Sequence, residues 1–224
     1  MPDSATLQLG VDLSQRRPLR DEAYAVLRQA ILSGQFKPGD HLIEREIAAQ
    51  LGLSRSPVRE AFRRLEQEHL VMATRQGLVV QELTPRDAQE LYQIRQQLEA
   101  LVARLAACNF RPEHLPLLEE ILSRTVEAIA ANDSALISAE GIKFHEALAE
   151  IAGNNHLKRL LASITEEIHR FRTLYVNIPA RSQSALAEHQ QILAAVTAHD
   201  QDLAARLMAE HIGQALLYTQ QGAE

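Results

Sequence analysis

The chain has 224 residues, which is enough for two modest domains that each bury a core. Hydrophobic residues make up 46% of it and charged residues 23%, a balance that excludes a largely disordered protein. The formal net charge is −6, but the first 85 residues carry 11 basic and 11 acidic side chains, so the excess negative charge lies in the remainder. A phosphate backbone is therefore a partner for the N-terminal part alone.

Cysteine usage and hydropathy indicate the cellular compartment of the protein. Cys108 is the only cysteine, which excludes an internal disulfide and any cysteine-based zinc site and fits a reducing environment. No apolar run approaches the roughly 20 residues of a membrane span, and the N-terminus lacks the layout of a signal peptide. We expect a cytoplasmic protein that does not contact a membrane.

The N-terminal part begins with an arm and a helix. Residues 1–20 show no periodicity, so we expect a flexible arm there. From Asp21 onward, apolar residues recur at helical spacing until Gly34, which is suited to cap the C-terminal end of a helix. The residues from Lys37 to Asp40 then predict a turn.

A helix-turn-helix follows. Residues 44–50 predict a short helix, and Leu51-Gly52-Leu53 predicts a tight turn after it. Ser54 is placed as the N-cap of a second helix. The stretch 53–65, which contains this helix, holds four arginines and only one glutamate. The apolar residues of this helix form a single stripe, which leaves the basic faces exposed to a phosphate or a base edge. An isolated basic helix is more often simply solvated, but the helix and turn before it favour DNA recognition.

Two short strands complete the N-terminal domain. The segments LeuValMetAla and LeuValValGln at 70–73 and 78–81 are separated by a glycine-containing break at 74–77. This pattern predicts a winged helix-turn-helix over residues 21–82, with Arg75 and Gln76 at the tip of the wing.

Several of these motifs, in this order, resemble the DNA-binding domain of GntR-family transcriptional regulators: IleLeuSerGly, LysProGlyAsp, HisLeuIleGluArgGluIleAla and LeuGlyLeuSerArgSerProValArgGluAla. The resemblance covers residues 23–82. It implies that one arginine on the first helix, three residues on the second, and the wing contact operator DNA, namely Arg45, Arg55, Ser56, Arg59, Arg75 and Gly77. For Arg63 and Arg64, phosphate contact and simple solvation remain equally open.

A second domain starts near residue 83. Thr84, Pro85 and Asp87 have the pattern of an N-cap, a first helical turn and a capping box. Helical periodicity then recurs at about 85–108, 112–131, 133–153, 155–176, 182–199 and 200–219, with no strand pattern. We therefore expect a mainly α protein whose winged helix-turn-helix precedes an all-helical bundle at 83–224.

Seven of the nine histidines lie in this second domain, and three of them fall on the apolar stripes of different helices. These are His145, His189 and His211. One inward histidine is more often a hydrogen-bonded core residue than a ligand. Three histidines that converge in one place need an explanation, because each neutral ring has a donor and an acceptor to satisfy. Binding of a divalent metal is one such explanation.

A second resemblance bears on this cluster. PheHis at 144–145, AlaGlyAsn at 152–154, GluHisGlnGlnIleLeu at 188–193 and AlaAlaArgLeuMetAlaGluHisIle at 204–212 resemble the helical effector domain, called FCD, of the FadR branch of the family. The resemblance implies a divalent metal held by the three histidines and an aspartate, beside a small carboxylate effector. Here Gly141 occupies the aspartate position, and Glu140 is rotated from it by about 100° on a regular helix. A site of histidines alone favours Zn or Ni.

Two further residues are candidates for effector binding, Arg95 and Asn154. Arg95 lies on the inward face of its helix, where a guanidinium can grip a carboxylate or can pair with Glu99 one turn on. Both alternatives stay open at this point.

The sequence thus predicts a dimeric, sequence-specific DNA-binding transcriptional regulator controlled by a small organic acid at a metal site. One alternative is a regulator whose signal is the metal itself. Another is a histidine-ligated metal hydrolase, which the sequence disfavours because no carboxylate is evident beside the histidines to act as a general base.

Overall fold

The computed structural model describes residues 18–75, 77–175 and 181–222 of the chain. The chain divides into two compact units, and the division falls between Glu82 and Leu83. The arm predicted at 1–20 lies almost entirely outside the described residues, as does Gln76 of the wing.

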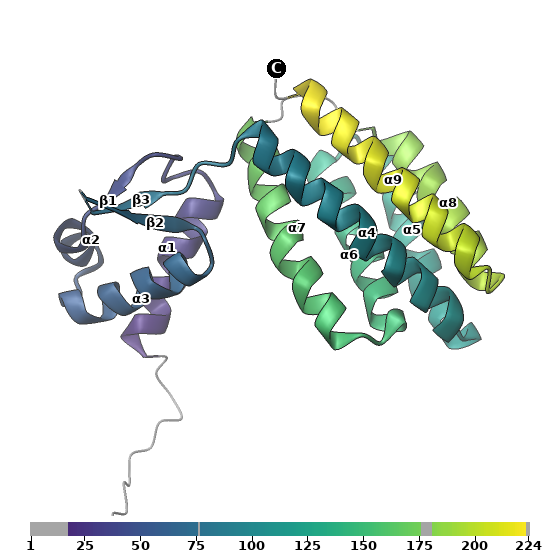
Figure 1. Ribbon diagram of the computed structural model, residues 1–224, viewed down its shortest axis with the longest axis horizontal. Coiled ribbons are helices and arrows are strands. Elements are labelled where there is room, and N and C mark those ends of the chain that lie inside the picture. The colour runs from purple at the N-terminus through teal and green to yellow at the C-terminus, as the bar shows by residue number, and fades with distance from the viewer. Residues whose placement is uncertain (1–17, 76, 176–180, 223–224) are drawn as a thin grey trace, which may run out of the picture. The chain divides into compact units, whose positions relative to one another are not determined.

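The first unit is a winged helix-turn-helix, as the sequence predicts (Figure 1). Its elements are α1 (Leu19–Leu32), β1 (His41–Leu42), α2 (Glu44–Leu51), α3 (Arg55–Gln67), β2 (Val71–Thr74) and β3 (Gly77–Val80). The sheet has the order β1-β3-β2 with antiparallel neighbours. The apolar stripe of α3 packs into the core of this unit, and Val58, Ala61 and Leu65 are completely buried. The opposite, basic side of α3 is left at the surface.

Local details differ from the sequence prediction. The first helix begins at Leu19 rather than Asp21, and Ser54 occupies the N-cap position of α3 without a hydrogen bond from its side chain. The two wing strands pair Thr74 with Gly77, so the turn is two residues long and not four. Gly77 has φ +124°, which a residue with a β-carbon rarely adopts. Strand β1 was not predicted, because two residues are too few to show an alternating pattern.

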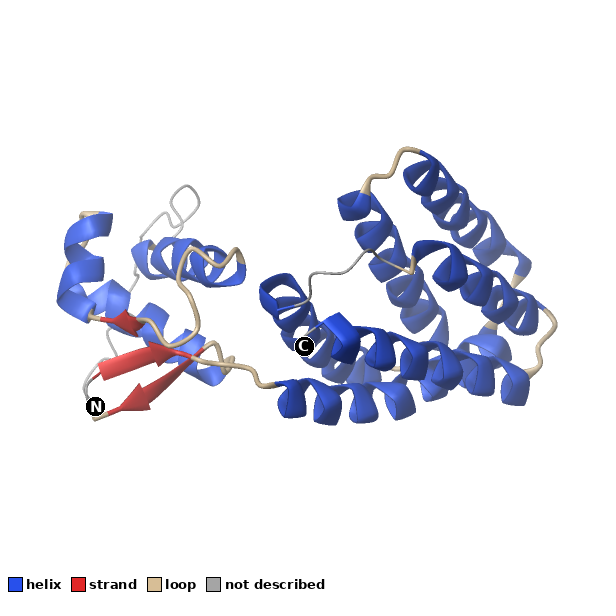
Figure 2. Ribbon diagram, turned by 90° about the horizontal axis from the view of Figure 1, so that it is seen from above, coloured by secondary structure: helices blue, strands red, loops and turns tan. Residues whose placement is uncertain are grey.

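The second unit contains only helices among its described residues (Figure 2). They are α4 (Pro85–Asn109), a short 3₁₀ helix (Pro112–His114), α5 (Leu115–Ala130), α6 (Ser134–Ala152), α7 (Asn155–Tyr175), α8 (Ser182–Thr197) and α9 (Gln201–Gly222). The capping box predicted before α4 is present: Thr84 Oγ1 accepts from the backbone N–H of Asp87, whose carboxylate accepts from the backbone N–H of Thr84.

Helix α4 is central to the second unit because it packs against α6, α7, α8 and α9. Its small inward residues, Ala103, Ala106 and Ala107, are completely buried and allow the neighbouring helices to approach closely. Phe144 of α6 and Met208 of α9 fill the space between the helices. No helix in the described part of the chain is long and apolar enough to cross a membrane.

Candidate metal site and DNA-binding surface

The three predicted histidines converge inside the second unit. His145 of α6, His189 of α8 and His211 of α9 each direct a ring nitrogen to a common point, and these nitrogens lie within 4.8 Å of one another. Nε2 of His211 is 3.2 Å from Nε2 of His189 and 3.3 Å from Nε2 of His145. His189 and His211 are 5% and 6% exposed, so the nitrogens meet in a place that water scarcely reaches.

Packing fixes the orientation of the rings. Phe144 stacks on His189 with the ring centroids 4.3 Å apart, and the rings of His145 and His211 stack at 5.3 Å. Because Phe144 and His145 are consecutive residues on α6, that helix both holds His189 in place and contributes a nitrogen of its own. The site is therefore defined by three helices from distant parts of the chain.

A carboxylate lies behind each of two histidines. Oε2 of Glu188 is 2.6 Å from Nδ1 of His211, and Oε2 of Glu99 is 3.1 Å from Nδ1 of His145. The sequence does not show these two carboxylates beside the histidines, and each lies on the outer side of its ring rather than in the cluster. Both acids were missed because they act on the ring nitrogens that face away from the cluster, and helical periodicity does not show which nitrogen faces which way.

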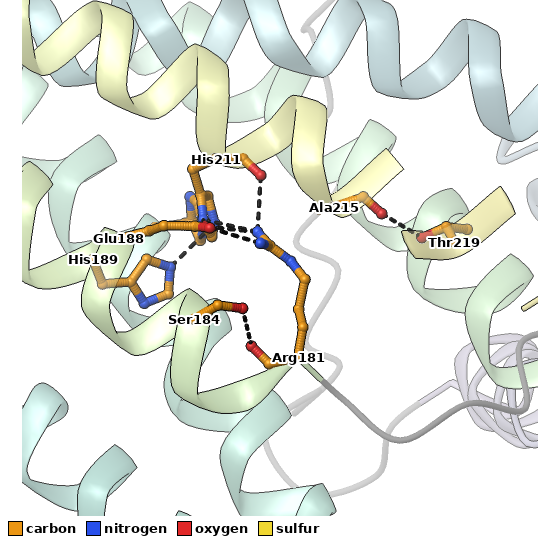
Figure 3. Close-up of polar contacts among 8 residues, drawn as sticks. Arg181, Ser184, Glu188, His189, His211, Ala215 and Thr219 are labelled. Atoms are coloured by element: carbon orange, nitrogen blue, oxygen red, sulfur yellow. Dashed lines mark hydrogen bonds and ion pairs between the residues drawn. The ribbon is translucent and has the colours of Figure 1, made fainter. Parts of the chain in front are cut away.

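Each of these carboxylates is in turn held by an arginine. Arg181 reaches from the start of α8 and donates Nη1–H and Nη2–H to the two oxygens of Glu188, both at 2.7 Å, and Nη2–H to the backbone carbonyl of His211 at 3.0 Å (Figure 3). Arg95 donates Nε–H and Nη2–H to Oε1 of Glu99 at 3.2 and 3.1 Å. Of the two alternatives for Arg95, the structure thus shows the pair with Glu99.

These contacts change the acidity of the groups. Burial alone would raise the pKa of Glu99, but His145 and Arg95 outweigh it and lower the pKa to about 2. Burial would likewise raise the pKa of Glu188, but His211 and Arg181 lower it to about 2. Burial lowers the pKa of His211 to about 4 despite the opposing effect of Glu188, and it lowers that of His189 well below its usual value. At neutral pH the acids are charged and these two histidines are neutral.

The charges determine where the ring protons lie. An ionised carboxylate can only accept, so Nδ1 of His211 must donate its proton to Glu188. Nη2 of Arg181 also lies 3.3 Å from this nitrogen. Because both atoms are then donors, this contact is not a hydrogen bond. In a neutral ring the other nitrogen is then a bare acceptor, so Nε2 of His211 presents a lone pair to the neighbouring rings. Nδ1 of His145 lies 3.1 Å from Oε2 of Glu99, but the two atoms do not form a hydrogen bond.

The glycine at position 141 leaves space beside the cluster. Helix α6 is regular through this position, and a β-carbon on Gly141 would have no neighbouring side chain or distant backbone within 4 Å. Glu140 is buried, and its Oε1 accepts from Nζ of Lys143 at 2.6 Å. Among the described residues only the three histidines form the cluster, so Glu140 does not replace the aspartate that the resemblance implies.

The second predicted effector residue has a structural role. Oδ1 of Asn154 accepts from the backbone N–H groups of His156 and Leu157 and so caps the first turn of α7. Asn154 is favoured in this position because its side chain satisfies N–H groups that the helix leaves unpaired. Helix capping therefore accounts for Asn154 without an effector.

The predicted DNA contacts all lie at the surface of the first unit. The six residues Arg45, Arg55, Ser56, Arg59, Arg75 and Gly77 are exposed. Arg59 is paired with Glu44 of α2. Arg64 is turned toward α1 instead, where it donates to Asp21 at 2.7 Å and lies 3.7 Å above the ring of Tyr24. Arg64 therefore stabilises the packing of α1 on α3.

Comparison with known proteins agrees with this architecture. Residues 19–80 match the family described as bacterial regulatory proteins of the gntR family, and residues 90–214 match the FCD domain. The chain belongs to the GntR family of transcriptional regulators and carries an FCD domain. It is 35% identical over 202 residues to the uncharacterised HTH-type transcriptional regulator YdhC of Bacillus subtilis. The match covers 89% of this chain and 90% of YdhC.

Two other regulators are similar over most of their length. The transcriptional repressor RspR of Escherichia coli is 27% identical, with 89% of this chain and 88% of RspR covered. The solved structure of E. coli McbR/YncC matches with a TM-score of 0.73 and 26% identity and covers 93% of this chain and 100% of that one. The GntR regulator described here is accordingly a DNA-binding transcription factor and not an enzyme.

The depressed pKa values predict acid sensitivity of the metal-free regulator. A histidine whose pKa is about 4 in the folded protein and 6.5 in the unfolded chain takes up a proton on unfolding, so its contribution to stability is lost as pH falls from 6.5 toward 4. His211 alone should lower the free energy of unfolding by about 1 kcal/mol between pH 7.5 and 5.5, and His189 should add to this. Urea unfolding of chelator-treated protein at the two pH values measures the difference.

A variant pair isolates the cause. His211→Gln should have a smaller loss of stability between these pH values than the wild type, whereas the change at the exposed His156, His156→Gln, should leave the loss unaltered. An identical pH dependence in the wild type and in His211→Gln would show that the buried ring does not titrate as described.

Proposed function

We propose that this regulator, a member of the FadR branch of its family, binds a divalent metal ion at His145, His189 and His211. We propose further that a small carboxylate effector completes the coordination and thereby controls binding to operator DNA. The observation that carries the proposal is the convergence of one ring nitrogen from each of three histidines in a largely buried site, where the Nε2 atoms of His145 and His211 are 3.3 Å apart. Two such nitrogens repel when neither carries a proton, unless a cation lies between them.

A proton is the weaker solution to this repulsion. Burial lowers the pKa of His189 and His211, so these two rings resist protonation at neutral pH. A metal ion binds the neutral rings directly and satisfies all the converging lone pairs at once. The arrangement of the two outer carboxylates is also typical of metal sites, in which the far nitrogen of a ligating histidine donates to a carboxylate that fixes its tautomer.

The spacing of the nitrogens supports zinc. Zinc binds histidine nitrogen at about 2.0–2.1 Å, and tetrahedral geometry at that distance separates two ligands by about 3.3 Å. The two Nε2 distances of 3.2 and 3.3 Å match this separation. A donor set of three imidazoles suits Zn or Ni better than Mg or Ca, which prefer oxygen.

Charge balance supports an anionic effector. Glu99 is paired with Arg95 and Glu188 with Arg181, so the surroundings of the cluster are nearly neutral and a bound dication would be uncompensated. Three histidines also leave at least one coordination position open. A carboxylate is the simplest ligand that supplies both an oxygen and a negative charge. The open space beside Gly141 gives it room.

The competing functions are weaker. A regulator whose signal is the metal alone needs no anion, but it would leave the charge of the dication unbalanced in a buried site. A hydrolase needs a carboxylate or another base that can reach a metal-bound water. Glu99 and Glu188 contact the far nitrogens of the histidines and are each paired with an arginine, so neither is placed for that task.

For the DNA-binding unit, we propose that Arg59 reads a base in the major groove, that Arg45, Arg55 and Ser56 contact the same operator, and that the wing at Arg75 and Gly77 lies in the neighbouring minor groove. All are exposed, and recognition helices of this type read the major groove. The operator is double-stranded and nearly palindromic, because one short helix buries too little surface to select a single site in a genome.

We expect metal and acid to bind with reciprocal affinity. Each should raise the affinity for the other by the same factor, since the acid supplies a ligand to the metal. Calorimetry measures the affinity for acetate in chelator-treated and zinc-loaded protein, and the affinity for zinc with and without acetate. His189→Ala and His211→Ala should weaken zinc binding by more than the roughly 10–100-fold typical of losing an outer partner, and His156→Ala should not.

Position 141 provides the matched variants. Gly141→Asp should tighten zinc binding and remove part of the gain from added acetate, because the new carboxylate occupies the open position. Gly141→Asn has nearly the same shape without the charge and should do neither. If acetate binds the metal-free protein as tightly as the zinc-loaded one, metal and acid do not share a site.

We expect a homodimer whose contacts are made by the helical unit. Ile94 and Leu101 lie two helical turns apart on α4 and are 51% and 41% exposed, so they form an apolar stretch that a second copy could cover. Light scattering of the full chain should give twice its mass without DNA, and with DNA the mass of two chains plus one duplex. Ile94→Glu combined with Leu101→Glu should reduce the mass without DNA toward the monomer. A monomeric wild type would refute the dimer.

A further inference from the structure

Arg59 is held in one orientation by a neighbouring acid. Its Nε donates to Oε2 of Glu44 at 2.9 Å and its Nη2 donates to Oε1 of the same residue at 2.8 Å. Glu44 is the first residue of α2 and Arg59 lies in the middle of α3, so the contact joins the two helices of the DNA-binding motif. Parallel hydrogen bonds of this kind fix the plane of a guanidinium as well as its position.

The contact leaves the reading edge of the arginine available. A guanidinium has two edges that can each donate a pair of hydrogen bonds, one formed by Nε and Nη2 and the other by Nη1 and Nη2. Glu44 uses the first edge. The second carries the geometry that matches O6 and N7 of guanine, and the side chain of Arg59 is 57% exposed. Nη2 belongs to both edges but carries two hydrogens, one on each, so Glu44 orients Arg59 and leaves Nη1 and the second hydrogen of Nη2 available to a base.

The other charged pair on this helix lacks these properties. Arg63 donates to Glu60 through Nη1 alone, at 3.1 Å, and the two side chains are 66% and 48% exposed. A single bond between two well-exposed residues one turn apart on the same helix does not fix a plane. Among the contacts that α3 makes with acids in the described part of the chain, only that of Arg59 is a pair of parallel hydrogen bonds between the two helices of the motif.

The charge of Glu44 has a second effect. Glu44 lies on the side of the unit that carries Arg55 and Arg59, where its negative charge repels phosphates whatever the DNA sequence. The repulsion lowers binding to every duplex, whereas the orientation of Arg59 helps only where a guanine is in reach. The orientation of Arg59 therefore widens the difference between the operator and other DNA, while the repulsion keeps the affinity for DNA without a suitably placed guanine low.

We propose that Glu44 is a positioning residue that determines sequence specificity: it presents Arg59 to a guanine of the operator and penalises binding to DNA without one. The proposal rests on the proposed role of Arg59 as a base contact. It predicts that loss of Glu44 acts in opposite directions on specific and non-specific binding, which a merely structural role would not do.

The test uses the full-length protein and duplex DNA. A preferred duplex is selected from a random library by the wild type, and each guanine of one half-site is then replaced by adenine in turn. Affinities for the preferred, substituted and scrambled duplexes are measured at two salt concentrations for the wild type, Glu44→Ala, Glu44→Gln, Arg59→Ala and Glu60→Ala. Glu60→Ala is the matched control, because it removes one exposed acid that pairs with an arginine of α3.

At the guanine where Arg59→Ala abolishes discrimination, the wild type should prefer guanine by roughly 5–150-fold. Glu44→Ala should reduce this preference by about threefold and bind the scrambled duplex about twofold to fivefold more tightly at low salt. Glu44→Gln should lie between Glu44→Ala and the wild type, since its oxygen can still accept one bond. Glu60→Ala should raise scrambled binding in the same way but leave the preference for guanine unchanged.

Each contrary result has a distinct meaning. If Glu44→Ala and Glu44→Gln, shown to be folded by circular dichroism, keep the full preference for guanine while Arg59→Ala loses it, Arg59 reads the base without help and the inference is overturned. If Arg59→Ala alters no guanine preference, the proposed base contact fails and the inference fails with it. If Glu60→Ala reduces the preference as much as Glu44→Ala does, the effect is one of charge alone and the inference is also overturned.

Discussion

A neutral imidazole has one donor and one acceptor, and in this GntR regulator a carboxylate lies against the outer nitrogen of two histidine rings. Glu188 accepts the proton on Nδ1 of His211, and Glu99 lies 3.1 Å from Nδ1 of His145. The inner nitrogens, one from each of α6, α8 and α9, meet in a place that water scarcely reaches. The packing of these helices around Phe144 therefore depends on how those nitrogens are satisfied, which is the role given above to the proposed metal ion.

The two units of the protein use charge in opposite ways. The DNA-binding unit concentrates arginines on one side of α3 while its total charge is balanced, so acids such as Glu44 and Asp21 stand close to the arginines and orient them. The helical unit holds its ionised groups in neutral pairs around the histidines. In the first unit the exposed arginines of α3 are available to the phosphates of DNA. In the second unit the charge is neutralised by internal pairs around the histidine cluster.

Sequence reasoning recovered the fold because the signals were local. The capping box at Thr84 and Asp87, the glycine at 77 and the apolar stripe of α3 each depend on residues a few positions apart. The same periodicity placed three histidines on inward faces. It does not place a side chain against a particular partner, so the capping contacts of Asn154 with the first turn of α7 appear only in the structure.

The missing parts were all pairings between distant residues. Glu99 meets His145, Glu44 meets Arg59, and Arg181 reaches past its own helix to His211. No pattern in the sequence reports such contacts, because they arise only when the helices are packed. The pair of Arg95 and Glu99 is the exception. The two residues are one helical turn apart, so the sequence alone indicates that Arg95 can pair with Glu99.

The protonation of the histidine rings can be observed directly by long-range ¹⁵N–¹H correlation spectroscopy of protein with labelled histidine, before and after zinc is added. In the metal-free protein His145 and His211 should carry their protons on Nδ1. Zinc should then shift the Nε2 resonances of His145, His189 and His211 while the Nδ1 protons of His145 and His211 stay in place. Protons on Nε2 of His145 and His211, or Nε2 resonances that do not respond to zinc, would contradict the metal site.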